Sequence, residues 1–350
     1  MDAAVYTGAG ILRIEDVPAA APGPGEVQVE VAYTGICGTD LHIFHGDLDA
    51  RVGNRAVLGH EMSGRVAAIG AGVDGWAVGD PVTVMPVESC GDCPACRAGN
   101  RHICQRLRFL GIDAPGSMQR RWTVPAETLV RIPPDVPLAE AALIEPLAVA
   151  VHDVGRAGLR PGEKALVVGG GPVGLLIAAV AAGAGGDVLV VEPNVHRRQV
   201  AEGLGLASVD PAATDVQEVV QGWTSGAGVD VTFEVSGAQA GVDTAVAALS
   251  VRGRLVLVAI HTTRRQVDLH RFFWRELALI GARLYDRTDF ERAVELVASR
   301  RIPLAGLIST VMPLHRVGEA FAALEAGDAV TKVLIDCQEQ PVAGAEAVPE

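Results

Sequence analysis

The uncharged segment from Ala165 to Gly186 limits the possible folds of this 350-residue chain more than any other segment. It is long enough to cross a bilayer as a helix. However, four residues that would break a membrane helix follow one another inside it, namely Gly169, Gly170, Gly171 and Pro172. We therefore predict a buried strand over Ala165–Val168, a glycine turn, and a buried helix over Val173–Ala184.

The alternation of strand and helix continues after this segment. Short apolar runs predict further strands at residues 188–191, 229–234, 254–259 and 277–280, with helical stretches between them. Strands that alternate with helices indicate an α/β fold with a doubly wound parallel sheet. Right-handed crossovers place helices on both faces of such a sheet.

The first part of the chain has a different pattern. Residues 1 to about 145 contain alternating segments such as Glu26–Val31, separated by glycine and proline turns, and this predicts a β-rich domain. Helical patterning appears at residues 138–155 and again at 290–299. We place the domains at residues 1–148 and 149–285. A C-terminal segment follows at 286–350, with a frayed tail from about residue 337.

The net charge excludes several classes of partner. At −13, the chain lacks the cationic face that nucleic-acid binding needs, and an acidic membrane surface would repel it. The N-terminus shows no basic region followed by an apolar core, so we expect no signal peptide. These features predict a cytoplasmic protein that acts on a small molecule, without a nucleic-acid or membrane partner.

The glycine turn fits the pattern G-x-G-x-x-G through Gly169, Gly171 and Gly174. Such a turn lets the backbone approach a pyrophosphate, and the N-terminus of the following helix offers free N–H groups to it. A purely structural turn is the alternative. We predict a dinucleotide site that contains Gly169, Gly171, Pro172, Val173, Gly174, Glu192 and Arg197.

The residue at the end of the next strand bears on the choice of cofactor. Glu192 can accept hydrogen bonds from both ribose hydroxyls and would repel a 2′-phosphate, which favours NAD over NADP. Arg197 and Arg198 weigh against this choice, since either could pair with a 2′-phosphate. We interpret both as solvated helix residues.

Four of the six cysteines lie within fifteen residues. Cys90, Cys93, Cys96 and Cys104 would present four thiolates on one short loop at residues 88–106. Four soft ligands with no open position are typical of a structural zinc site. A redox relay and an iron–sulfur cluster are the alternatives, although the spacing does not match the usual ferredoxin pattern.

A second set of metal-binding residue types is dispersed along the chain. Cys37, His60, Glu61 and Glu145 could place a thiolate, an imidazole and carboxylates in one cleft. Three protein ligands would leave a fourth zinc position for water or substrate, which is the catalytic arrangement. Each residue also has a structural interpretation, and spacing alone leaves the choice open.

Five motifs, taken in order, resemble the medium-chain zinc-dependent alcohol dehydrogenases. They are Cys37-Gly-Thr-Asp, Gly59-His-Glu, the four-cysteine loop, Glu145-Pro-Leu-Ala and Gly169-Gly-Gly-Pro-Val-Gly. The resemblance extends to about Asp336. It implies a GroES-like catalytic domain interrupted by a Rossmann domain, with the C-terminal segment returning to the catalytic domain and the active site in the cleft between them. The Glu145-Pro version resembles the polyol branch. This resemblance implies a homotetramer, with a homodimer as the alternative.

The resemblance implies a role for each residue of the dispersed set. Cys37 and His60 match the family's zinc ligands, and Glu61 matches the carboxylate ligand of the polyol branch. Glu145 matches a second glutamate of that branch. Because a second bound carboxylate would make the site net negative, we expect Glu145 to lie behind the ligands or to exchange with water.

Further residues match the family's proton relay and substrate contacts. Thr39 and His42 match the hydroxyl and the imidazole of the relay, and we expect Asp40 to be structural. Tyr285 falls at the position of a substrate-side tyrosine. Leu284 stands where sorbitol dehydrogenases carry an arginine, which argues against sorbitol as the substrate.

Together these features predict an NAD-linked enzyme with two zinc ions per chain, one catalytic and one structural. It would reversibly oxidise a secondary alcohol of a diol, polyol or cyclitol to a ketone. A threonine 3-dehydrogenase and a zinc-free, NADP-linked reductase of the quinone oxidoreductase type are alternatives within the family. A non-catalytic, zinc-stabilised binding protein is the alternative from a different class.

Overall fold

A computed structural model describes residues 1–339 of the chain except residues 9 and 328. The chain divides into two compact units. Unit 1 takes in the described residues among 1–145, 308–327 and 332–339, and unit 2 takes in residues 146–307 and 329–331. Among the described residues, no helix combines the length and apolarity that a bilayer crossing requires.

Unit 1 is built on β-strands, as its alternating sequence predicts. Its seven-stranded sheet has the order β10-β6-β5-β3-β18-β17, and β9 also pairs with β3. These strands are β3 (Glu26–Gly35), β5 (Glu61–Ile69), β6 (Pro81–Val84), β9 (Arg121–Pro125), β10 (Leu129–Arg131), β17 (Ile308–Pro313) and β18 (Lys332–Asp336). A second sheet has the order β2-β1-β4, with β1 (Asp2–Tyr6), β2 (Leu12–Asp16) and β4 (Ala56–Val57).

Short elements complete unit 1. The pair β7 (Val87–Glu88) and β8 (Arg108–Phe109) encloses the cysteine-rich loop. The helices are α1 (Gly38–Phe44), α2 (Asp49–Val52), α3 (Pro94–Arg97), α4 (Leu138–Ala141) and α12 (Val317–Ala326), and the 3₁₀ turns are η1 (Arg101–Ile103), η2 (Ala126–Thr128) and η4 (Leu314–Arg316).

The C-terminal strand β18 returns to the centre of unit 1. It pairs antiparallel with the end of β3, where Leu334 lies opposite Gly35. The structure describes residues 337–339, where the predicted tail begins. Cys337 is fully buried and donates its backbone N–H to Ala32, while the amide of Gln338 donates to the carbonyl of Val31. These hydrogen bonds extend the ordered chain beyond β18, and residues 340–350 of the predicted tail lie outside the described residues.

Unit 2 confirms the predicted doubly wound parallel sheet. Six strands lie in the order β13-β12-β11-β14-β15-β16, and each pair is parallel. The strands are β11 (Lys164–Val168), β12 (Asp187–Val191), β13 (Ala207–Val209), β14 (Val229–Glu234), β15 (Leu249–Leu257) and β16 (Ala278–Gly281). The chain order reverses between β11 and β14, which is the position where such sheets bind ligands at the carboxyl ends of their strands.

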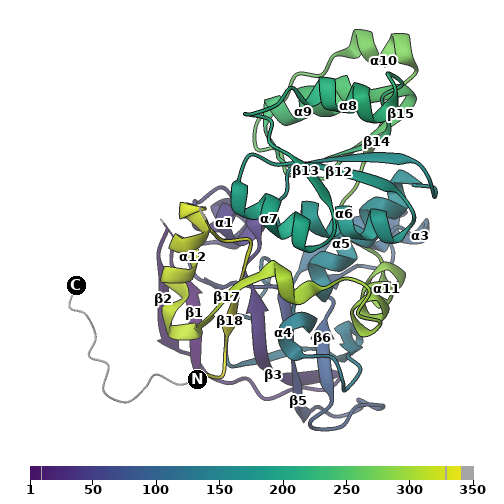
Figure 1. The fold of residues 1–350 in the computed structure, drawn as a ribbon. Helices are drawn as coiled ribbons and strands as arrows, with labels where there is room; N and C mark the ends of the chain where they lie inside the picture. The colour runs from purple at the N-terminus through teal and green to yellow at the C-terminus, as the bar shows by residue number, and fades with distance from the viewer. Residues whose placement is uncertain (9, 328, 340–350) are drawn as a thin grey trace. The chain divides into compact units, whose positions relative to one another are not determined.

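Helices cover both faces of this sheet. Figure 1 shows α8 and α9 on one side and α6 and α7 on the other. The helices of unit 2 are α5 (Ile144–Ala157), which begins at the end of unit 1, α6 (Pro172–Gly183), α7 (Val195–Gly203), α8 (Val216–Thr224), α9 (Gln239–Ala248), α10 (Leu269–Arg275) and α11 (Arg287–Ala298), with the 3₁₀ turn η3 (Leu304–Leu307).

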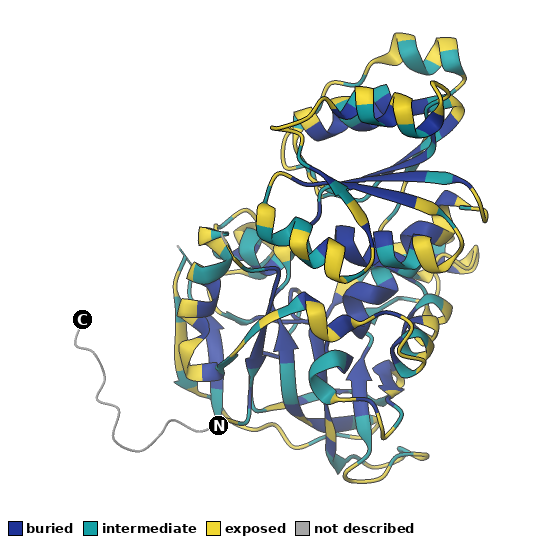
Figure 2. Ribbon diagram, viewed as in Figure 1, coloured by how far each residue is buried: buried dark blue, intermediate teal, exposed yellow. Residues whose placement is uncertain are grey.

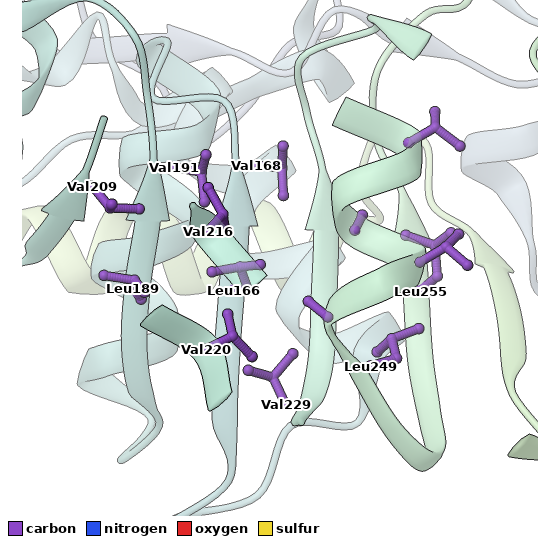
Figure 3. Close-up of a cluster of buried hydrophobic side chains, with 14 residues drawn as sticks. Leu166, Val168, Leu189, Val191, Val209, Val216, Val220, Val229, Leu249 and Leu255 are labelled. Carbon is purple, nitrogen blue, oxygen red and sulfur yellow. The ribbon is translucent and has the colours of Figure 1, made fainter. Parts of the chain in front are cut away.

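The apolar strands explain this layering. Side chains from the strands and from α8 meet in one buried cluster, in which Leu166, Val220 and Leu249 are at most 1% exposed (Figure 3). The strands of the sheet are mostly buried, whereas the covering helices carry exposed residues on their outer sides (Figure 2). The uncharged segment Ala165–Gly186 therefore forms the buried strand β11 and the covering helix α6 rather than one continuous helix.

One predicted boundary differs from the compact units. Residues 286–307 were expected to follow the second domain, but they belong to unit 2. Asp286 caps α11 by accepting from the backbone N–H of Asp289, and Asp289 in turn contacts His152 on α5 at 2.7 Å. These contacts hold α11 against unit 2.

Candidate metal centres and cofactor site

Cys37, His60 and Glu61 form one donor group in unit 1. One potential ligand atom from each residue lies within 4.8 Å of the others. Cys37 is the N-cap of α1 directly after β3, whereas His60 and Glu61 stand at the start of β5. Because β3 and β5 pair antiparallel, with Gly35 opposite Glu61, the sheet register brings the two segments together.

Gly35 makes room for the carboxylate of Glu61. A Cβ atom at residue 35 would lie 2.2 Å from Glu61 Oε2, so this carboxylate could not keep its position. His60 and Glu61 are 3% and 1% exposed, so both are withdrawn from bulk water. The glycine therefore fixes a buried carboxylate beside the thiol and the imidazole.

Asp40 contacts two of these residues, Cys37 and His60. Its Oδ2 accepts from the backbone N–H of Cys37 at 2.9 Å, and its Oδ1 lies 3.7 Å from His60 Nδ1. Burial raises the pKa of Asp40. Burial alone would lower the pKa of His60, but the charges of Asp40, Cys37 and Glu145 outweigh it and raise that pKa well above its usual value. The group therefore has the negative potential that recruits a cation.

Lys332 is a further residue of this site that no sequence motif marked. It is 1% exposed, its Nζ contacts Glu61 Oε2, and it donates to the carbonyl of Ile36 at 2.9 Å. Burial alone would lower the pKa of Lys332, but Glu61, Cys37 and Glu145 outweigh this effect and raise it. No local pattern marks this lysine, because β18 reaches the site only through its pairing with β3.

Lys332 also changes the charge balance of the site. Without Lys332, a second carboxylate at the site would be an excess negative charge. A thiolate and two carboxylates carry three negative charges, which a divalent cation and one ammonium group balance. Glu145 is 4% exposed and lies near enough for its charge to act on both His60 and Lys332, although it is not a member of the close donor group. A direct or exchanging role for Glu145 stays a prediction.

The donor set fits Zn²⁺. A thiolate, an imidazole and a carboxylate are three of the ligand types that zinc takes, and three protein ligands leave one position open. His60 Nδ1 is buried and, among the described residues, has no hydrogen-bond partner, while Glu61 Oε2 contacts the ammonium group of Lys332. A bound cation would satisfy such an unpaired atom.

The predicted relay residues lie on α1. Thr39 and His42 are three residues apart and therefore share one side of the helix. Thr39 Oγ1 is 3.8 Å from Cys37 Sγ. His42 Nδ1 lies 2.8 Å from Asp47 Oδ2, a partner that the sequence analysis did not identify. The imidazole is one-third exposed, so it can reach solvent.

The four cysteines of the loop form a second donor group. Their Sγ atoms all lie within 4.8 Å of one another, and all four cysteines are free of disulfides. The backbone amides of Cys96 and Gln105 donate to Cys93 and lower its pKa to about 6. Four closely spaced thiols with such backbone support match a closed, structural zinc site.

The glycine turn lies at the carboxyl end of β11. Gly169 has φ +109°, and a Cβ there would lie 2.9 Å from the backbone nitrogen of Ser236. Gly171 is the N-cap of α6 and Pro172 its first residue, and a Cβ at Gly174 would lie 1.9 Å from the carbonyl oxygen of Gly169. The turn therefore has the close packing that the fingerprint requires.

Glu192 stands at the end of β12, beside the glycine turn. Its Oε2 accepts from the backbone N–H of Gly170 at 2.6 Å, and its Oε1 accepts from that of Asn194 at 2.8 Å. Arg197 Nη1 is 3.9 Å from Glu192. Arg198 donates to the carbonyls of Glu192 and Pro193 and pairs with Asp210, so backbone and carboxylate contacts already use its guanidinium.

Tyr285 belongs to the interior of unit 2. It is fully buried, and its ring centroid lies 5.2 Å from that of Phe290. The preceding Leu284 has φ +57°, an unusual conformation for a branched residue. Contact between Tyr285 and a substrate stays a prediction.

Comparison with known proteins identifies the family. The model of the alcohol dehydrogenase GroES-like domain matches residues 23–134, and that of the zinc-binding dehydrogenase domain matches residues 172–299. The chain is 50% identical to the 2-dehydro-3-deoxy-L-galactonate 5-dehydrogenase of Pseudoalteromonas atlantica, over 96% of this chain and 99% of the relative. It is 35% identical to the (R,R)-butanediol dehydrogenase of Neisseria gonorrhoeae, over the same shares.

A solved structure agrees with these relatives. A zinc-binding dehydrogenase from Sinorhizobium meliloti, bound to NADP, has a TM-score of 0.90 and 30% identity, over 96% of this chain and 98% of that one. The chain belongs to the medium-chain, zinc-binding dehydrogenases. It is therefore an oxidoreductase that uses zinc and a nicotinamide cofactor, which confirms the predicted family, fold and enzyme class.

Proposed function

We propose that this enzyme oxidises a secondary hydroxyl of a polyhydroxylated substrate to a ketone, reversibly, at the group formed by Cys37, His60 and Glu61. The carbohydrate acid named for the relative at 50% identity and the diol named for the relative at 35% identity both support this class. The observation that carries the proposal is the donor group itself, in which His60 and Glu61 are buried and Lys332 pairs with the carboxylate of Glu61.

Residues of this chain would bind and move the alcohol proton. When bound, zinc supplies Lewis acidity toward the substrate oxygen, and the nicotinamide accepts a hydride. We assign the proton to Thr39 Oγ1 and then to His42, which holds it before release to solvent. Asp47 orients the imidazole through Nδ1, which leaves Nε2 for the exchange. Cys37, His60 and Glu61 would hold the metal, with Asp40 fixing the backbone of Cys37.

We infer that the cofactor is NAD rather than NADP. The buried carboxylate of Glu192 stands where a ribose would lie and would repel a 2′-phosphate. Arg198 is occupied by backbone carbonyls and Asp210, which supports its structural interpretation. A catalytic efficiency with NADP⁺ equal to that with NAD⁺ would refute this inference.

We also propose a homotetramer, with a homodimer as the alternative. The edge strand β16 and the exposed Phe273 and Trp274 of α10 support an assembly through unit 2. Light scattering that gives the mass of a single chain would contradict this proposal.

An NAD⁺ reduction screen tests the proposed function. It would compare 2-dehydro-3-deoxy-L-galactonate, (R,R)-2,3-butanediol, sorbitol, a cyclitol and L-threonine, with ethanol as the reference. The proposal predicts the highest kcat/KM among the polyhydroxylated substrates or the diol, with sorbitol poor because Leu284 replaces arginine. A clear preference for threonine would favour the threonine dehydrogenase alternative, and no turnover of any alcohol would contradict the proposal.

A further inference from the structure

Arg51 and Asp113 join two segments that flank the metal-binding residues. Arg51 lies on α2, downstream of Cys37, and Asp113 lies on the turn at residues 109–118. Arg51 Nε donates to Asp113 Oδ1 at 2.7 Å, and Nη2 donates to Oδ2 at 2.6 Å. This two-point pair fixes the plane of the guanidinium.

The turn at residues 109–118 is itself fixed to His60. Cβ atoms at Gly111 and Gly116 would lie 2.4 and 2.3 Å from the carbonyl oxygen of Gly59, so this backbone packs directly against the residue before His60. The ring of Phe109 meets the His60 imidazole edge-on at 5.2 Å between centroids. Phe109 also donates its backbone N–H to Asp113 Oδ2 at 2.7 Å. Asp113 therefore holds Arg51 at a defined position relative to a metal-binding residue.

Arg51 keeps donors available for a ligand. The pair with Asp113 uses two of the five N–H donors of the guanidinium, and Nη1 takes no part in it. The side chain is 39% exposed. A guanidinium with a free edge matches a carboxylate in geometry and charge.

We propose that Arg51 determines substrate specificity by binding the carboxylate of a polyhydroxy acid. The secondary hydroxyl of the same molecule would be oxidised at the group of Cys37, His60 and Glu61. Asp113 acts as a positioning residue, because it orients Arg51 without touching the substrate. The proposal rests on the proposed function and narrows its substrate class from polyols in general to sugar acids.

The chain offers a matched control for a test of Arg51. Arg55, four residues later, also makes a two-point pair with a carboxylate: its Nη1 and Nη2 donate to the two oxygens of Glu15 at 3.0 and 2.5 Å. Glu15 belongs to β2, outside the turn at residues 109–118. Arg51→Gln and Arg55→Gln therefore remove the same charge and the same kind of ion pair from one short segment.

Steady-state kinetics with the sugar acid and the butanediol of the screen would distinguish a carboxylate contact of Arg51 from a general disturbance of its loop. In Arg51→Gln we expect kcat/KM for 2-dehydro-3-deoxy-L-galactonate to fall about 10- to 100-fold, mainly through KM, as for a lost charge-assisted hydrogen bond. The value for butanediol should stay within about twofold, since that substrate has no carboxylate. Arg55→Gln should leave both values unchanged.

Three results would overturn the proposal. In the first, Arg51→Gln lowers kcat/KM equally for the acid and the diol, which would indicate a disturbed loop rather than a lost carboxylate contact. In the second, Arg51→Gln leaves the acid unaffected. In the third, the wild-type enzyme oxidises the diol but not the acid; this result refutes the role of Arg51 and leaves the proposed function intact. Turnover of none of the alcohols in the screen would refute both.

Discussion

At the scale of the residue, Lys332 gives the metal centre its charge balance. The chain has 29 basic residues, but the only lysines in its sequence are Lys164 and Lys332. Lys332 is fully enclosed beside Glu61, whereas Lys164 pairs with Asp187 at the surface, at 2.5 Å. An ammonium group is compact, so it fits a narrow buried position where a guanidinium would need more room.

The two lysines allow a controlled stability experiment. Lys332→Met leaves Glu61 as a buried, unpaired charge, so we expect the free energy of unfolding of the metal-free protein to fall by about 3–5 kcal/mol. Lys164→Met breaks a surface pair and should cost at most about 1 kcal/mol. Urea unfolding of both variants in the presence of a chelator measures the difference. Equal losses of unfolding free energy would show that the buried pair contributes no more to stability than the surface pair.

Residue types with a fixed local spacing were predictable from the sequence, but their distant partners were not. Only the family resemblance of the motifs around Cys37 and His60 pointed to one group, and the structure brings Cys37, His60 and Glu61 together. Lys332 and Asp113 carry no motif, and their contacts join residues far apart in the sequence. Asp47 lies only five residues from His42, but no motif marks that pair either. Each acts through a contact that depends on strand pairing or on the path of a loop, and neither is encoded by spacing along the chain.

At the scale of the element, glycines decide how closely the turn at residues 109–118 approaches β5. A Cβ at Gly116 would lie 2.3 Å from the carbonyl oxygen of Gly59 and 2.5 Å from that of Leu58. Gly318, on α12 of the same unit, has no heavy atom within 4 Å of the corresponding position. The two glycines therefore differ in packing, although neither has a positive φ.

This difference predicts opposite effects of alanine. Gly116→Ala should push the turn away from His60, lower kcat, and cost about 1–3 kcal/mol of stability. Gly318→Ala should keep full activity and add up to about 1 kcal/mol, because alanine is the better helix former. Thermal unfolding and kinetics of the two variants provide the measurement. Wild-type activity in Gly116→Ala would contradict the close packing of this turn.

Elements with a strong apolar pattern were predicted closely. The strand at residues 229–234 has the predicted bounds, and those at 165–168 and 188–191 each begin one residue earlier than predicted. The strand expected at 254–259 begins at Leu249 and ends at Leu257. Its first half contains Ser250, Arg252 and Gly253, and the pairing of Val229 with Leu249 rather than an apolar pattern defines it.

At the scale of the whole molecule, two different patterns of hydrophobic residues correspond to the two compact units. Alternating residues gave the β-rich unit 1, and buried strands with helices between them gave the parallel sheet of unit 2. The return of the chain to unit 1 was expected only through the family resemblance. It occurs at residue 308 rather than 286, because contacts to α5 hold α11 with unit 2.

The most direct test of the account combines a zinc count with NAD⁺ reduction in two cysteine variants. Cys37 belongs to the proposed catalytic group, whereas Cys337 is a buried, disulfide-free cysteine that lies outside both donor groups. We predict about two zinc ions per wild-type chain. Cys337→Ala should keep both ions and its activity. Cys37→Ala should retain about one ion, at the four-cysteine loop, and lose activity. Retained turnover, or an unchanged zinc content, in Cys37→Ala would contradict the assignment of Cys37 as a ligand of the catalytic zinc.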